Sequence, residues 1–197
     1  MLVVLKLFKQ PLSIPERELL QSASFGEVGT LVVHSHPLED SYSVAIRDAA
    51  CAALGTSGID YQLVDFSEGD ELRLHRQPDH LVAVYPTWWG GPPAVMLDWL
   101  QGALGDHVDG NARAETSPLA SVRRVTVVTT HGSSVLLNKM QGQPGKLTWS
   151  RVVIPQCAPG AEFEWLALYE IDTSTTAERS GFIDKVTAHF TSATVPA

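Results

Sequence analysis

The residues of this chain that could do chemistry gather in three short segments, and the most informative one spans residues 85–95. It holds two adjacent tryptophans, Trp88 and Trp89, followed by two glycines and two prolines. Each indole has a large apolar surface and an N–H group that needs a partner, so a pair of them in a loop is costly unless something flat covers at least one. The glycines remove the Cβ atoms that would keep a ligand from the backbone. The segment therefore favours a planar ligand that forms hydrogen bonds.

The second segment spans residues 34–43 and ends in three hydroxyl side chains, Ser41, Tyr42 and Ser43. They coincide with the predicted start of a helix, where free backbone N–H groups and the helix dipole favour a phosphate. Taken alone, Ser41 could equally serve only as the helix cap. Beside the tryptophan segment, the phosphate interpretation is the stronger one.

The same segment contains a possible metal pair, His34 and His36, with Asp40 as a further ligand. Alternate residues of a strand point to the same face, so the geometry is possible. A third strong ligand at a recognisable spacing is missing, and we therefore expect no metal site.

The third segment spans residues 129–134, Thr-Thr-His-Gly-Ser-Ser. All three segments follow apolar runs that we interpret as strands, so they leave the same carboxyl edge of a parallel sheet, where ligands bind in open α/β folds. Two threonines at a strand end are a weak signal alone, because they often reflect β-propensity. A serine hydrolase that uses Ser133 or Ser134 with His131 is disfavoured, since the Gly-x-Ser-x-Gly turn is absent.

Residues 85–94, Tyr-Pro-Thr-Trp-Trp-Gly-Gly-Pro-Pro-Ala, with Trp99 further on, resemble the flavin-binding loop of the flavodoxin-like NAD(P)H:quinone reductase family. The other two segments resemble its His, Ser, aromatic, Asn pattern, with Ser43 in place of Asn, and its Thr-Thr-x-Gly stretch. The resemblance covers residues 29–197, the expected flavin-binding domain, and leaves residues 1–28 as an N-terminal extension of unknown role. The cofactor-binding residues that it implies are His36, Ser41, Tyr42, Ser43, Pro86, Thr87, Trp88, Trp89, Gly90, Thr129, Thr130, His131 and Gly132.

The resemblance implies an α/β fold, a flavodoxin-like three-layer sandwich whose five-stranded parallel sheet has the order 2-1-3-4-5. It implies FMN as the cofactor, with FAD as the alternative, and NADH or NADPH as the co-substrate. The implied enzyme is an NAD(P)H dehydrogenase (quinone)-like flavin reductase, which passes hydride through flavin N5 to a quinone or a similar two-electron acceptor. A flavin-binding regulatory or electron-carrier protein with little turnover is the alternative.

Two residues are the catalytic candidates within this interpretation. Trp89 would form a wall of the acceptor slot, and His131 would donate a proton, although a solvent-exposed loop histidine is an equal alternative. Mammalian-type members of the family carry a Tyr and a His in the third loop, and this chain has neither at the nearest positions, which include Asn138. Their particular acid–base chemistry is therefore in doubt here.

Family members are homodimers, so the resemblance also implies a second subunit. Met96, Trp99 and Leu100 are apolar and would suit the contact between subunits. Trp88 is expected to pack nearer the core or the partner than Trp89 does.

From residue 29 onward, apolar runs alternate with helical patterns, as in parallel α/β proteins. The fifth strand is ambiguous between residues 152–154 and 165–169, and the need for a crossover helix after the fourth strand favours 165–169. Residues 175–178, Thr-Thr-Ala-Glu, form a predicted capping box that opens the last helix. That helix should turn Phe182, Ile183, Val186 and Phe190 toward the sheet. The other predicted elements are strands at 31–33, 61–66, 81–85 and 122–130, a loop at 105–118, and helices at 16–22, 41–54 and 95–100.

The composition of the chain limits which kinds of partner and which cellular compartment we expect for it. The chain has 197 residues, which fits one domain, and a formal net charge of −8 without a basic cluster, so nucleic acid is not expected to bind. Cys51 and Cys157 lie far apart and outside any Cys-x-x-Cys pattern, which favours a reducing cytoplasm without disulfides. No segment approaches the roughly 20 apolar residues of a membrane-spanning helix, and we expect a soluble protein.

Overall fold

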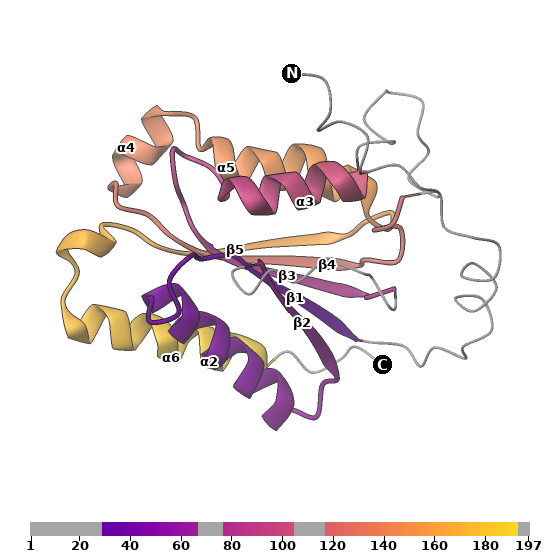
Figure 1. Cartoon of the computed structure of the whole chain (residues 1–197), viewed down its shortest axis with the longest axis horizontal. Coiled ribbons are helices and arrows are strands. Elements are labelled where there is room, and N and C mark those ends of the chain that lie inside the picture. Colours follow the sequence, from indigo (N-terminus) through magenta and orange to yellow (C-terminus); the bar gives the residue numbers. More distant parts are fainter. Residues whose placement is uncertain (1–28, 67–76, 105–116, 193–197) are drawn as a thin grey trace, which may run out of the picture.

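Five parallel strands form a single sheet in the computed structural model, which describes residues 29–66, 77–104 and 117–192 (Figure 1). The strand order is β2-β1-β3-β4-β5, and each neighbouring pair is parallel. The predicted flavodoxin-like α/β fold is therefore confirmed. The extension at 1–28, its predicted helix, and most of the predicted loop at 105–118 lie outside the described residues. The strands are β1 (Thr30–His34), β2 (Tyr61–Asp65), β3 (His80–Pro86), β4 (Arg124–Thr130) and β5 (Glu162–Leu168).

Helices cover both faces of the sheet, which gives three layers (Figure 1). α2 (Tyr42–Thr56) and α6 (Thr176–Ser192) pack together on one face, and α3 (Ala94–Leu104) lies on the other with part of the crossover between β4 and β5. Because both faces are covered, all five residues of β1 are buried, as in other parallel sheets. The crossover contains α4 (Val135–Met140), α5 (Pro144–Leu147), a π-helical turn (Thr148–Val153) and a 3-10 turn (Ile154–Gln156).

The capping box predicted for α6 is present. The backbone N–H of Thr175 donates to Glu178 Oε2 at 2.7 Å, and the backbone N–H of Glu178 donates to Thr175 Oγ1 at 3.2 Å. These reciprocal bonds satisfy donors that have no partner inside the helix. Phe182, Val186 and Phe190 are buried as predicted, whereas Ile183 is only partly buried against the same core.

The fifth strand is the segment favoured by the crossover argument. Residues 152–154 belong to the π-helical and 3-10 turns, while β5 pairs in parallel with β4, from Arg124↔Glu162 to Thr130↔Leu168. The crossover is fixed to the sheet by Trp149, whose Nε1–H donates to the hydroxyl of Tyr85 at 2.7 Å. Both side chains are almost fully buried, so this bond satisfies two polar groups that water cannot reach.

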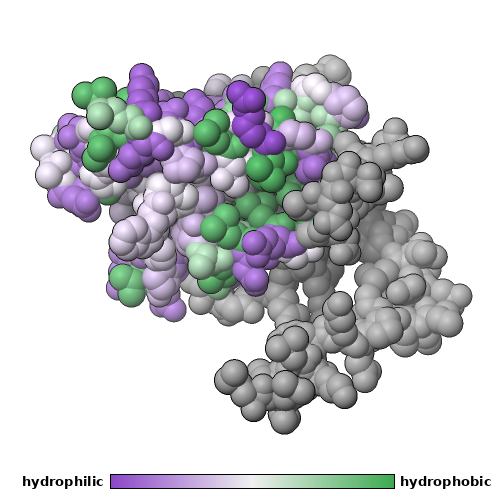
Figure 2. Space-filling view, turned by 90° about the horizontal axis from the view of Figure 1, so that it is seen from above, coloured by the Kyte–Doolittle hydropathy of each residue, from purple (hydrophilic) through white to green (hydrophobic). Residues whose placement is uncertain are grey.

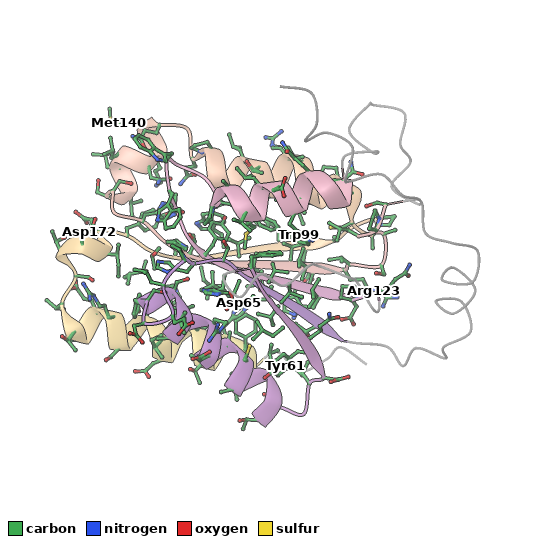
Figure 3. The ribbon with its side chains drawn as sticks, in the orientation of Figure 1. Tyr61, Asp65, Trp99, Arg123, Met140 and Asp172 are labelled. Carbon is green, nitrogen blue, oxygen red and sulfur yellow. The ribbon has the colours of Figure 1, made fainter. Side chains whose placement is uncertain are left out.

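The expectation that Met96, Trp99 and Leu100 face a second subunit is wrong. All three are more than 90% buried in this chain's own core, and Trp99 lies between α3 and the sheet (Figure 3). The helical spacing identified an apolar stripe correctly, but an apolar stripe packs on its own sheet before it is available to a partner.

Neither cysteine forms a disulfide. Cys51 and Cys157 are free and buried, and burial raises the pKa of the Cys51 thiol to about 11 and that of Cys157 to about 12. Both thiols are therefore protonated and unreactive at neutral pH. Among the described residues, no helix combines the length and the apolar character needed to cross a bilayer.

A half-buried histidine, His80, lies on the α6 face of the sheet. The hydroxyl of Thr126 donates to Glu164 Oε2 at 2.9 Å, so Thr126 Oγ1 is the acceptor for Nε2–H of His80, also at 2.9 Å. His189 Nε2 contacts the same Glu164 oxygen at 3.2 Å. Burial, together with the nearby side chains of Arg124 and His189, lowers the pKa of His80 to about 3. His80 is therefore neutral in the folded protein.

We expect acid to destabilise the fold through His80. Between the ordinary pKa of 6.5 and the folded pKa of about 3, the unfolded chain binds a proton that the folded chain does not, so stability falls as pH decreases. One such group contributes at most about 1.4 kcal/mol per pH unit to the free energy of unfolding. Denaturant unfolding at several pH values in this window measures the slope. His80→Gln keeps an N–H donor and should reduce the slope, leaving the part that the buried histidines contribute; an unchanged slope would contradict the assignment.

Candidate functional site

The three segments selected from the sequence leave β1, β3 and β4 at one edge of the sheet and contact one another there. The His36 ring lies 5.8 Å from the Trp88 ring, which joins the first loop to the second. The backbone N–H of Thr87 donates to the carbonyl of Thr130 at 2.8 Å, which joins the second to the third. The convergence predicted from the strand pattern is therefore present.

The two tryptophans belong to a tight hairpin, residues 88–91, whose tip is Trp89 and Gly90. Trp88 and Gly91 exchange two backbone hydrogen bonds of 2.9 and 3.0 Å, and the residues between them, Trp89 and Gly90, have φ angles of +53° and +83°. Two positive φ angles are what a type I′ turn requires. This backbone costs a residue with a Cβ about 1 kcal/mol or more, so the fold holds Trp89 there under strain. The side chain of Trp89 is fully exposed, whereas that of Trp88 is 42% exposed.

The hairpin is supported from below by the segment that follows α4. The N–H of Gly145 donates to the carbonyl of Gly90 at 2.7 Å. A Cβ on Gly145 would lie 2.8 Å from that carbonyl oxygen, and a Cβ on Gly90 would lie 2.9 Å from Pro144. Two glycines are thus needed for the backbones to approach this closely. The hairpin is a fixed element, not a free loop.

His131 lies behind the hairpin and is buried, so the alternative of a solvent-exposed loop histidine is wrong. Its Nδ1 lies 2.9 Å from the side-chain nitrogen of Asn138, and its Nε2 lies 3.4 Å from Thr87 Oγ1. The ring stacks on Tyr169, with 4.6 Å between centroids and 10° between planes. Burial lowers the pKa of His131 to about 4, so the ring is neutral at neutral pH.

The other residues of the third loop are held by the protein itself. Thr129 is fully buried, and its hydroxyl lies 2.9 Å from that of Thr87. Thr130 is also buried and supplies the carbonyl that Thr87 contacts. A Cβ on Gly132 would lie 2.7 Å from a carboxylate oxygen of Asp172, which belongs to the 3-10 turn Ile171–Thr173 after β5 (Figure 3). Gly132 therefore lies close against the Asp172 side chain of that turn.

In the first loop, the three hydroxyls predicted to bind phosphate are all used within the protein. Ser41 Oγ accepts from the backbone N–H of Val44 at 3.3 Å and caps α2. The hydroxyl of Tyr42 donates to the carbonyl of Arg179 at 2.7 Å, and that of Ser43 bonds to His34 Nε2 at 3.1 Å. An anion at this position would depend on the backbone N–H groups at the start of α2.

His34 and His36, the possible metal pair that the sequence analysis disfavoured, make separate contacts in the described part of the chain. His34 is fully buried, and its Nδ1 lies 2.8 Å from Asp65 Oδ2, which also pairs with Arg47. Burial lowers the pKa of His34, and the opposing effect of Asp65 only partly offsets this. His36 instead accepts from the backbone N–H of Leu38 at 3.0 Å. Within the described ranges, no group of three or more His, Cys, Asp or Glu side chains could hold a metal ion.

Two residues of the site were missed by the sequence analysis or given no role in it. Tyr169 follows β5 and stacks on His131 at the same sheet edge as the three loops. The predicted fifth strand, 165–169, included this residue, so the rule that selected the other loops, a polar side chain directly after a strand, passed over it. Asn138 is the buried residue of α4, and its side chain contacts the ring of His131. No spacing in the sequence indicates this contact.

The arrangement defines a flavodoxin-like protein with an aromatic hairpin at the carboxyl edge of its sheet. No family model and no curated protein matches the sequence. Solved structures do match. Smu.1420 from Streptococcus mutans has 16% identity and a TM-score of 0.68, over 83% of this chain and 98% of that one. An NAD(P)H:quinone oxidoreductase from Methanothermobacter marburgensis has 16% identity and a TM-score of 0.62, over 84% of this chain and 96% of that one. An FMN-dependent NADH-azoreductase from Bacillus anthracis, in complex with FMN, has 10% identity and a TM-score of 0.59, over 82% of this chain and 97% of that one. At these identities the likeness shows the fold.

Gly145→Ala should displace the tryptophan hairpin, because the new Cβ meets backbone atoms of Gly90 and Gly91 that cannot move independently. Overpacking of this kind costs about 1–3 kcal/mol. Thermal unfolding and the emission maximum of the tryptophans measure the effect. Gly91→Ala is the matched control, since its Cβ would meet nothing within 4 Å. Equal effects of the two variants would show that the close approach to Gly90 is unimportant.

Proposed function

We propose that this protein is a flavin-dependent NAD(P)H oxidoreductase that reduces a quinone or a similar two-electron acceptor. The observation that carries the proposal is Trp89, which the fold holds fully exposed on a strained turn beside the loops of β1 and β4. A strained, exposed aromatic at a converging sheet edge is a reason to infer ligand binding. Support comes from fold neighbours that are themselves named NAD(P)H:quinone oxidoreductase and FMN-dependent NADH-azoreductase.

The residues at this edge fit a flavin mononucleotide. The backbone N–H groups of Tyr42 and Ser43 have no hydrogen-bond partner among the described residues, and they open a helix of 15 residues. A Cβ on Gly91 would meet nothing within 4 Å, so a planar ring can approach the hairpin backbone. The phosphate would lie against His36, Ser41, Tyr42 and Ser43, the ring against Pro86, Thr87, Trp88, Trp89 and Gly90, and its polar edge against Thr129, Thr130, His131 and Gly132. FAD remains the alternative.

When bound, the flavin would supply hydride transfer between NADH or NADPH and the acceptor. The protein's own part is to bind and orient. Trp89 would form one wall of the slot that the nicotinamide and the acceptor occupy in turn. The pairing of Thr87 with Thr129 and Thr130 would hold the hairpin at a fixed distance from the third loop. His131 as a proton donor stays a prediction.

The purified protein should bind FMN and turn over. We expect a yellow colour that persists through gel filtration after reconstitution with FMN, and oxidation of NADH or NADPH with menadione as the acceptor. Trp89→Ala should weaken FMN binding by roughly tenfold, or about 1.4 kcal/mol, the scale of an aromatic stack. Leu63→Ala removes an exposed side chain from the edge strand β2 and is the control.

The outcomes of this experiment separate the hypotheses. A protein that takes up neither FMN nor FAD would contradict the proposal altogether. FMN reduction in a single stoichiometric step without turnover would instead favour a flavin-binding regulatory or electron-carrier protein.

We also propose a homodimer, now through different residues. Figure 2 shows apolar surface on the side that carries α3 and the crossover helices. The exposed apolar residues of these elements are Val95, Leu97, Val135, Leu136, Leu137, Met140, Leu147 and Val152. Exposed apolar area of this kind is typical of protein interfaces. Because both cysteines are free and buried, we keep the cytoplasm as the proposed compartment.

Paired charges on this face should convert a dimer into a monomer. Leu147→Asp with Val152→Asp places two carboxylates on exposed apolar positions of the crossover, and their desolvation would oppose association. Light scattering after gel filtration measures the mass. Ala52→Asp, on the exposed side of α2 at the opposite face of the sheet, is the control. A wild-type monomer, or a double variant that stays dimeric, would contradict this interface.

A further inference from the structure

Helix α4 has its polar and apolar sides reversed. Its buried residue is Asn138, with 4% of its surface exposed, whereas Leu136 and Met140 of the same helix are 69% and 76% exposed. Burying an amide costs free energy unless the amide is fully hydrogen-bonded. A short helix that buries an amide instead of a leucine needs a reason for that placement, and the contacts of Asn138 supply one.

The side-chain nitrogen of Asn138 lies 2.9 Å from His131 Nδ1 and 3.4 Å from Ser133 Oγ. An amide nitrogen only donates hydrogen bonds, so Nδ1 of the imidazole must accept. A neutral imidazole carries its one hydrogen on the other nitrogen, which here is Nε2. The position of Asn138 therefore selects one of the two neutral tautomers of His131.

The selected tautomer gives direction to a line of hydroxyls. Nε2–H of His131 points at Thr87 Oγ1, 3.4 Å away, so the hydroxyl hydrogen of Thr87 is free to donate to Thr129 Oγ1 at 2.9 Å. The hydroxyl of Thr129 in turn reaches the carbonyl of Thr130 at 3.5 Å. The hydrogen bonds thus all run in one direction. Asn138 donates to His131, His131 to Thr87, and Thr87 to Thr129 of β4.

The surroundings of the imidazole contain few charges. Tyr169 stacks on one side of the His131 ring, and the ring of Trp165, a residue of β5, has its centroid 6.1 Å from that of His131. One acidic group on a packed element is Asp172, whose carboxylate lies against Gly132, next to His131 in the chain. No described basic side chain bonds to the ring. Burial is the physical cause of its lowered pKa.

We propose that Asn138 is a positioning residue, which holds His131 as the Nε2–H tautomer so that the ring serves as a fixed hydrogen-bond donor to Thr87 beneath the tryptophan hairpin. The importance of this for catalysis rests on the proposed function, while the tautomer itself does not. This proposal replaces the proton-donor role that the sequence predicted for His131. The acceptor would take its protons from solvent, and we expect the rate of reduction to show no titration of His131 between about pH 5 and pH 8.

Nitrogen-15 NMR of the histidine-labelled full-length protein tests the tautomer directly, because protonated and unprotonated ring nitrogens have well-separated shifts. We expect His131 Nδ1 to be unprotonated and Nε2 protonated at neutral pH. Asn138→Asp replaces a donor with a charged acceptor, so it should move the hydrogen to Nδ1 and raise the pKa of His131 by at least about one unit. Gln141→Glu makes the same amide-to-carboxylate change at an exposed position at the end of α4 and should leave His131 unchanged.

A protonated Nδ1 in the wild-type protein would overturn the proposal, and this result needs no variant to fold. Equal behaviour of Asn138→Asp and Gln141→Glu would overturn it as well. If FMN binds and turns over, the pH profile of menadione reduction adds a second readout: it should gain a titration in Asn138→Asp that the wild type and Gln141→Glu lack. Failure to bind flavin would contradict the proposed function but leave the NMR result decisive for Asn138.

Discussion

The pairing of β3 with β4, continued one residue beyond the end of the sheet, is the interaction on which the rest of the site depends. The two strands stay in register to Pro86 and Thr130, so the loops that follow start at the same level. Thr87 then extends the ladder with a backbone bond to Thr130 and a hydroxyl contact to Thr129. A slip of one residue would turn the hairpin and His131 away from each other, because side chains alternate between faces.

The site is built from groups that would each be unfavourable without the surrounding fold. Trp89 has a left-handed backbone and an exposed indole, and the ring of His131 is kept neutral by burial. Each arrangement is held by a rigid neighbour: Gly145 supports the hairpin, and Asn138 and Tyr169 hold the imidazole. Positions where local preference is overridden in this way are where function is expected in an otherwise consistent sequence.

The helices and strands could be predicted from the sequence because their signals are local, whereas the order of the strands came from the family resemblance. Apolar runs, helix spacing and the capping box at Thr175 and Glu178 each report on a few neighbouring residues, and the length of the crossover selected the correct fifth strand. The site was predicted only as a set of loops. The partner of Tyr42 is 137 residues away at Arg179, and His34 pairs with Asp65 of another strand. Such contacts leave no periodic signal, so the sequence does not show that the hydroxyls assigned to a phosphate also have hydrogen-bond partners within the protein. The apolar stripe of Met96 and Trp99 likewise does not reveal whether it meets its own sheet or a partner.

A crystal structure of the protein with FMN would test the central claim most directly. The account predicts the isoalloxazine ring against the hairpin of Trp88 and Trp89, with its polar edge at Thr130 and His131 and its phosphate at the first N–H groups of α2. FMN bound at another part of the molecule, or a hairpin edge left empty at saturating FMN, would contradict it.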